Sequence, residues 1–67
     1  MFPDRTTIER IQKLKELYAM HYNLFIAICL DKGIKAAEPH SNKMQEIEKE
    51  LITYLGYSVF KLWANSL

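Results

Sequence analysis

The segment from Leu17 to Leu30 constrains the fold of this chain more than any other feature. It contains no Lys, Arg, Asp or Glu, and its second half, Leu24 to Leu30, is apolar at every position. From Ile8 onward the apolar residues recur at the spacing of an α-helix. A helix with one apolar stripe packs against one neighbour, whereas a helix that is apolar all round must be covered on several sides. The rest of the chain therefore has to supply several packing partners for this segment.

The sequence predicts an all-α fold with two helices in one domain, 1–67. The first helix is expected over about 7–32 and the second over about 42–64, with a loop over 33–41. Few glycines and prolines interrupt the chain, which favours long helices. Two helices of this length joined by a loop are expected to form an antiparallel hairpin.

Local signals along the chain indicate where the helices begin, end or are interrupted. Asp4 or Thr6 is expected to cap the first helix, because short polar side chains accept hydrogen bonds from exposed N–H groups. Gly33 is expected to end it with a positive φ. Pro39 indicates a loop, because the residue before a proline disfavours the α conformation. Gly56 falls inside the second predicted helix, where we expect close packing against it, with a kink as the alternative.

The predicted hairpin is too small to cover its own apolar surface. A domain of ~60 residues buries only about 60% of its unfolded surface, and the single cysteine excludes an internal disulfide. Each large apolar side chain contributes ~1.5–3 kcal/mol when it is fully buried. We therefore expect two hairpins to dimerise into a four-helix bundle. The expected interface residues are Leu24, Ile26, Ile28, Leu30, Ile52, Phe60 and Trp63.

A layer of polar-tipped rings is predicted inside the hairpin. A turn at about residue 37 or 38 would place Tyr18 near Tyr57 and His21 near Tyr54. Rings of this kind form either a hydrogen-bonded belt or the lining of a small pocket, and we favour the belt. Its expected members are Tyr18, His21, Tyr22, Tyr54 and Tyr57.

The sequence lacks the spacings that are typical of metal or catalytic sites. No Cys-x-x-Cys, His-x-x-x-His or Glu-x-x-His pattern occurs, and there is no glycine-rich phosphate loop. Cys29 lies in the most apolar stretch, where a thiol acts as a small hydrophobic side chain. We therefore expect no catalytic residue, no bound metal and no cofactor.

Charge and length limit the partners that the sequence predicts. The formal net charge is +1, which gives no general attraction for nucleic acid. A cluster of basic residues near the start, interleaved with acidic ones, keeps nucleic-acid binding as an alternative. Its members are Arg5, Arg10, Lys13 and Lys15. The uncharged run is shorter than the ~20 residues of a membrane span, and Met1–Thr7 lacks the apolar run of a secretory signal. A soluble cytoplasmic protein is expected.

These observations predict a non-catalytic interaction or regulatory protein that contacts itself and another, unidentified protein. A small nucleic-acid-binding bundle is the alternative, and a small helical enzyme such as a phosphatase is the next. Small two-helix aspartyl-phosphate phosphatases carry the motif Ser-Gln-Glu-Leu-Asp. The segment Glu48–Ile52 keeps only its Glu and Leu, so the chain is not assigned to that family.

Overall fold

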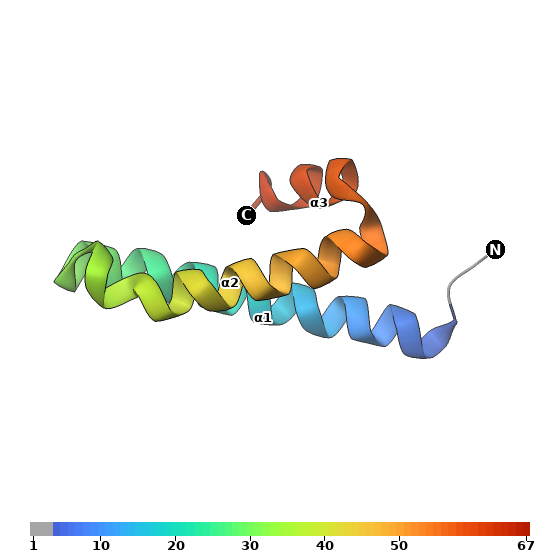
Figure 1. The fold of residues 1–67 in the computed structure, drawn as a ribbon, viewed down its shortest axis with the longest axis horizontal. Helices are drawn as coiled ribbons and strands as arrows, with labels where there is room; N and C mark the ends of the chain where they lie inside the picture. The colour runs from blue at the N-terminus through green and yellow to red at the C-terminus, as the bar shows by residue number, and fades with distance from the viewer. Residues whose placement is uncertain (1–3) are drawn as a thin grey trace.

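Residues 4–67, the part of the chain that the computed structural model describes, fold into three α-helices (Figure 1). Helix α1 spans Arg5–Lys32, α2 spans Ile34–Leu55 and α3 spans Tyr57–Ala64. No β-strand occurs in this part of the chain, so the prediction of an all-α fold is confirmed. The prediction of two helices is wrong, because the second half of the chain forms two helices, α2 and α3, instead of one.

Helix α1 begins at an aspartate cap and ends at a glycine, as its sequence predicts. Of the two caps considered, Asp4 makes the bond: its carboxylate accepts a hydrogen bond from the Thr7 N–H at 2.7 Å. That bond lowers the pKa of Asp4 below its usual value, because it favours the charged form. At the other end, Gly33 has φ 93° and donates its N–H to the carbonyl oxygen of Cys29 at 3.1 Å, so the predicted positive φ is confirmed.

The predicted loop over 33–41 is wrong, because α2 starts directly after Gly33. Pro39 lies in the second turn of α2, where it withholds one backbone hydrogen bond from the carbonyl of Lys35. Helical structure persists there because the neighbouring side chains pack against the rest of the molecule: Ala37 is fully buried and His40 is half-buried. Tertiary packing outweighs the local preference of the proline.

Gly56 ends α2 and redirects the chain. It has φ 84°, and it donates its N–H to Ile52 while its carbonyl accepts from Phe60. No described atom lies within 4 Å of the position that a Cβ would take at Gly56. The expected close packing is therefore wrong. Instead the glycine allows α3 to fold back so that Phe60 enters the core.

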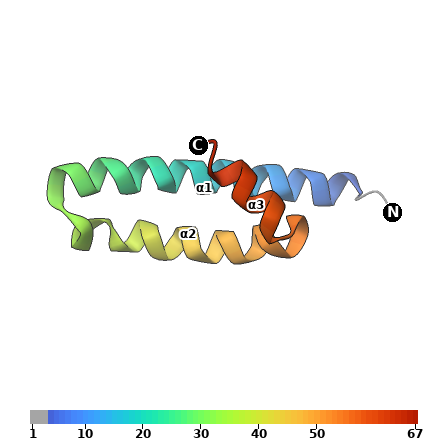
Figure 2. The same ribbon diagram turned by 90° about the horizontal axis from the view of Figure 1, so that it is seen from above.

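Helices α1 and α2 lie side by side and antiparallel, and α3 crosses the pair near the middle of α1 (Figures 1 and 2). The molecule is elongated, with extents of 45 × 21 × 16 Å. Its core lies where the three helices meet and consists of Leu14, Ile47, Leu51 and Phe60. In the half of the molecule that contains Gly33, the fully buried side chain among the described residues is that of Ala37.

The pairing of α1 with α2 differs from the predicted pairing. A turn at residue 37 or 38 would set Glu50 opposite residue 25, but its side chain binds Arg10. Likewise His21 contacts His40 and not Tyr54. The chain reverses earlier than predicted, at Gly33, and this slides α2 along α1.

Candidate functional site

His21 of α1 and His40 of α2 meet between the two long helices. Their Nδ1 atoms lie 3.0 Å apart, their ring centroids are separated by 5.3 Å, and both side chains are half-buried. Two imidazole nitrogens at this distance hold one proton between them, so one ring donates and the other accepts. The contact therefore requires that at least one of the two Nδ1 atoms is unprotonated.

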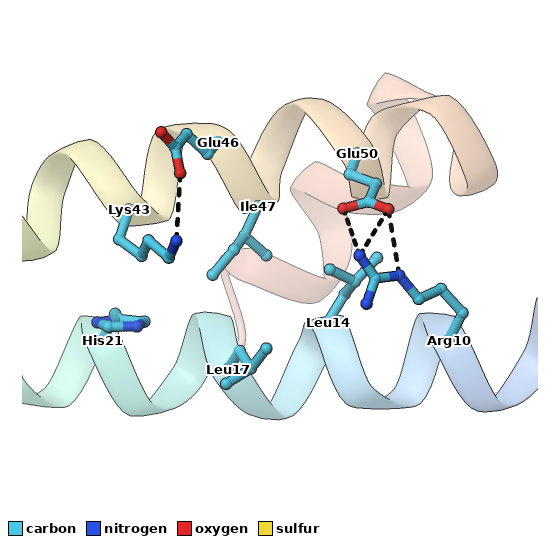
Figure 3. A pocket seen from close by; sticks show the side chains of 8 residues that line it. All are labelled: Arg10, Leu14, Leu17, His21, Lys43, Glu46, Ile47 and Glu50. Carbon is cyan, nitrogen blue, oxygen red and sulfur yellow. Dashed lines mark hydrogen bonds and ion pairs between the residues drawn. The ribbon is translucent and has the colours of Figure 1, made fainter.

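A groove runs along the same two helices from His21 toward the start of α1 (Figure 3). Its volume is about 180 Å³, below the ~300–1,000 Å³ of typical small-molecule pockets. Leu14, Leu17 and Ile47 provide its apolar lining, while an ion pair of Lys43 with Glu46, at 3.5 Å, stands beside it. The groove therefore has room for several water molecules but not for a typical organic ligand.

Arg10 and Glu50 close the far end of the groove (Figure 3). Three donor–acceptor distances of 2.9, 3.0 and 3.1 Å join the guanidinium to the carboxylate in a forked pair. Hydrogen bonding to Glu50 raises the pKa of Arg10 above its usual value, and the charge of Glu50 adds to this effect. Both side chains are partly exposed, and the pair joins α1 to α2 at the surface.

Tyr18 connects α1 to α3 through aromatic contacts. Its ring meets Phe60 edge to face, with centroids 5.5 Å apart, and lies 5.4 Å from Trp63. Burial raises the pKa of Tyr18, and the negative charge of Glu48 raises it further. On the outer side, the Lys15 ammonium lies 5.6 Å from the centroid of the Trp63 ring. These contacts attach α3 to the first half of α1.

The five rings expected to form a belt are not brought to one level. Tyr18 packs on α3 and His21 on His40, while Tyr22 is half-buried. Tyr54 is exposed, and Tyr57 is 60% exposed on α3. The predicted layer depended on a turn near residue 37 and an unbroken second helix. The early turn and the break at Gly56 remove both conditions.

The seven residues expected at a dimer interface fall into two groups. Phe60 is buried in the core, and Ile52 and Trp63 pack against it, so these three serve the chain's own fold. The other four lie on α1, and of these Leu24, Ile26 and Leu30 are exposed, Ile28 half-buried.

Eleven large apolar side chains are exposed among the described residues, and four of them are Ile8, Ile34, Tyr54 and Leu67. The other seven lie on α3 and on the half of α1 nearer Gly33. We call these seven residues the apolar set: Met20, Leu24, Ile26, Leu30, Tyr57, Val59 and Leu62. Where exposed apolar side chains form a continuous patch, they are typical of interaction surfaces.

The basic cluster near the start of the chain is largely engaged within the molecule. Arg5 forms an ion pair with Glu9 at 3.3 Å, Arg10 is held by Glu50, and Lys15 lies over Trp63. Two of the four positive charges, those of Arg5 and Arg10, are therefore paired with carboxylates within the molecule.

Two residues of this site, His40 and Glu50, were not predicted at these positions. The predicted loop over 33–41 contained His40, and the predicted pairing set Glu50 opposite residue 25 instead of Arg10. Gly33 is the signal that could have placed both residues. If this glycine forms the whole connection between the two long helices, α2 begins early enough for His40 and Glu50 to face α1. Pro39 concealed that signal, because it favoured a loop.

Within residues 4–67, no three His, Cys, Asp or Glu side chains form a group that could hold a metal ion. Among the described helices none combines the length and apolarity needed to cross a membrane. Compared with protein-family models, curated proteins and solved structures, the chain has no match in any of the three.

Proposed function

We propose that this protein is a non-catalytic interaction module that pairs with a second copy of itself through the apolar set. In the proposed dimer, the α1–α2 hairpins of two chains associate about a two-fold axis, so that four long helices form one bundle. The dimer then presents its remaining surface to another protein.

The amount of exposed surface is the observation that carries this proposal. A compact monomer of 7.9 kDa exposes about 4,400 Å², whereas this chain exposes 5157 Å². The excess, 5157 minus about 4,400, is roughly 750 Å², close to the ~800 Å² that each partner buries in a standard interface. The radius of gyration, 13.1 Å, also exceeds the roughly 10.9 Å expected for 67 residues.

The arrangement of α1 explains why its own partner helix leaves this surface uncovered. His21 faces α2. At 100° per residue, Ile26 and Leu30 lie about 140° and 180° around the helix from His21, on the side away from α2. Helix α3 packs on the first half of α1 and is too short to cover them. A helix from another chain is needed to bury this side.

The chemistry of the apolar set favours a second copy as the occupant. A two-fold interface places the same patch of each chain against itself, so the patch has to be self-complementary. Charged patches repel their own copies, whereas an uncharged apolar patch does not. All seven members of the set are uncharged, and the net charge of +1 adds little repulsion between chains.

Sedimentation equilibrium at micromolar concentration tests the proposal. The expected mass is twice the 7.9 kDa of one chain. Leu30→Glu and Leu62→Glu introduce charge at residues that the fold leaves 84% and 74% exposed, so each variant should remain helical but become monomeric. Gln12→Glu, an exposed polar residue on α1, is the matched control and should leave the dimer intact.

A single-chain mass for the unmodified protein, together with a cooperative thermal transition, would contradict the dimer. A folded monomer that binds a different protein through the same residues would instead identify a heterologous partner. Nucleic-acid binding has less support, because three of the four basic residues of the cluster already have partners within the chain.

A further inference from the structure

We propose that His21 and His40 form a binding site for a divalent transition-metal ion, with their two Nδ1 atoms as neighbouring ligands. The ion is of the type that prefers imidazole nitrogen: Zn²⁺, Ni²⁺ or Cu²⁺. The inference rests on the His21–His40 contact and does not depend on the proposed dimer.

The separation of the two nitrogens matches that of two ligands on one ion. Metal–nitrogen bonds to histidine are about 2.0–2.1 Å long. Two such ligands lie about 2.9 Å apart at a right angle and about 3.4 Å apart at the tetrahedral angle. The Nδ1 atoms of His21 and His40 are 3.0 Å apart, within this range.

Only a small movement converts the contact into a metal site. In the hydrogen bond each Nδ1 points along the line that joins the two nitrogen atoms. Around a shared ion, each Nδ1 lone pair has to point about 40° away from that line. The terminal torsion of a histidine is broad, so both rings can make this turn at little cost. The ion then takes the place of the shared proton. The donor ring moves its proton from Nδ1 to Nε2, so both rings bind the ion as neutral imidazoles and no net proton is released.

The helices hold the two ligands in place. His21 lies on α1 and His40 on α2, and the same two helices are joined by the core pair Leu14 and Ile47 and by the Arg10–Glu50 fork. A site built on two packed helices loses less entropy on binding than a site on a loop. Both rings are half-buried, so the contact still reaches solvent.

The remaining coordination positions are completed from outside this pair. No third His, Cys, Asp or Glu side chain of residues 4–67 joins the two histidines in a cluster. Water can fill the open positions, and so can the His21 and His40 of a second copy. Oxygen-preferring ions such as Mg²⁺ and Ca²⁺ have no carboxylate ligands here and should not bind at this pair.

Titration of the full-length chain with Zn²⁺ and with Ni²⁺ tests the site. The measurements use Cys29→Ser as the parent, which removes the thiol as a competing metal ligand. Calorimetry should show one ion per chain when water completes the coordination, and one ion per two chains when a second copy does. At a metal concentration 100-fold above Kd, the thermal midpoint should rise by roughly 10–20 °C. Mg²⁺ at the same concentration should produce no shift.

Two variants decide whether the histidines are the ligands. His21→Gln and His40→Gln should each weaken Zn²⁺ binding at least tenfold. Glu46→Gln, at an exposed carboxylate beside the groove, should leave the binding unchanged. ¹⁵N chemical shifts of the imidazoles in the parent should move at Nδ1 of both residues, a readout that does not depend on the stability of the variants.

The outcomes separate the possibilities. Absence of Zn²⁺ and Ni²⁺ binding at millimolar metal, or binding that survives both histidine variants, would overturn the proposal and leave an ordinary hydrogen bond. Binding with the imidazole shifts supports it. The stoichiometry then identifies the completing ligand: one ion per chain indicates water, and one ion per two chains, with a sedimentation mass of at least two chains, indicates a second copy.

Discussion

Tyr18 attaches α3 to α1 by contacts that require an uncharged ring. It packs edge to face on Phe60 and lies beside Trp63, and its hydroxyl is partly removed from water. Burial raises the pKa of Tyr18 above its usual value, since the phenolate is less well solvated there. Ionisation of this one residue therefore opposes the docking of a whole helix.

Tyr18→Phe should flatten the dependence of stability on pH above about pH 10. In the original protein the unfolded chain loses the Tyr18 proton first, so stability is complete below about pH 10 and is lost as pH rises through the higher folded pKa. Urea midpoints at about pH 8.5 and pH 10.5 measure this slope. Tyr57→Phe, at an exposed ring of α3, is the control, and equal slopes for Tyr18→Phe and the original protein would contradict the assignment.

Gly33 is the whole connection between the two long helices. Its φ of 93° and ψ of 172° lie in a region that is essentially restricted to glycine. Gly33→Ala should destabilise the protein by about 1–2 kcal/mol, since strain of about 1–3 kcal/mol outweighs the smaller entropy lost by the unfolded chain. The change in urea midpoint checks this value.

A synthetic chain with D-alanine at position 33 is the matched control. D-alanine favours positive φ, whereas L-alanine does not. Apart from residue 33 and its two neighbours in the chain, no described atom lies within 4 Å of the Cβ position of L-alanine, so the cost of the L-residue should arise in the backbone. The D-residue should therefore retain or slightly increase stability. If the L- and D-alanine proteins were equally destabilised, the cost would arise from packing and not from the backbone.

Replacement of Pro39 in α2 is expected to have the opposite effect and to stabilise the protein. Proline inside a helix is about 3 kcal/mol less favourable than alanine. Because proline restricts the unfolded chain, it also stabilises the folded protein, but by only about 0.4–1 kcal/mol. Pro39→Ala should therefore stabilise the protein by about 2 kcal/mol and increase its helicity by circular dichroism. Glu38→Ala, at the adjacent exposed position, should change stability little. A loss of stability in Pro39→Ala would indicate that the proline contributes packing.

The helix ends differ in how far the sequence predicts them. Asp4 and Gly33 act through bonds and torsions within a few residues, so local rules identified both. Pro39 and Gly56 were misread because their local preferences compete with distant contacts: Ala37 beside the proline is buried, and Phe60 beyond the glycine enters the core. Local rules cannot weigh such contacts before the register of the helices is known.

At the scale of the whole molecule, the structure separates the residues predicted at an interface into exposed and packed ones, and the interface itself stays a prediction. Leu24, Ile26 and Leu30 are exposed, as an interface requires, but Phe60 and Trp63 are used by the chain's own third helix. The same apolar character suits a residue for the core of one chain or for contact between chains. Which use prevails depends on where Gly56 directs α3, and spacing along the sequence does not contain that information.

Helix α3 should therefore be essential for a folded chain, because Phe60 is 1% exposed in the core while its neighbours on the same short helix face outward. Phe60→Ala should destabilise by about 3–5 kcal/mol, a large share of the roughly 3–10 kcal/mol available to a chain of this length. Phe60→Leu, which retains most of the volume, should cost about 1–2 kcal/mol and remain measurable. Leu62→Ala, at a 74% exposed position of α3, is the control; measured in the monomeric Leu30→Glu variant, it should leave the urea midpoint nearly unchanged. Similar losses at Phe60 and Leu62 would mean that α3 does not dock as the structure places it, and the core would then have to be closed by a second chain.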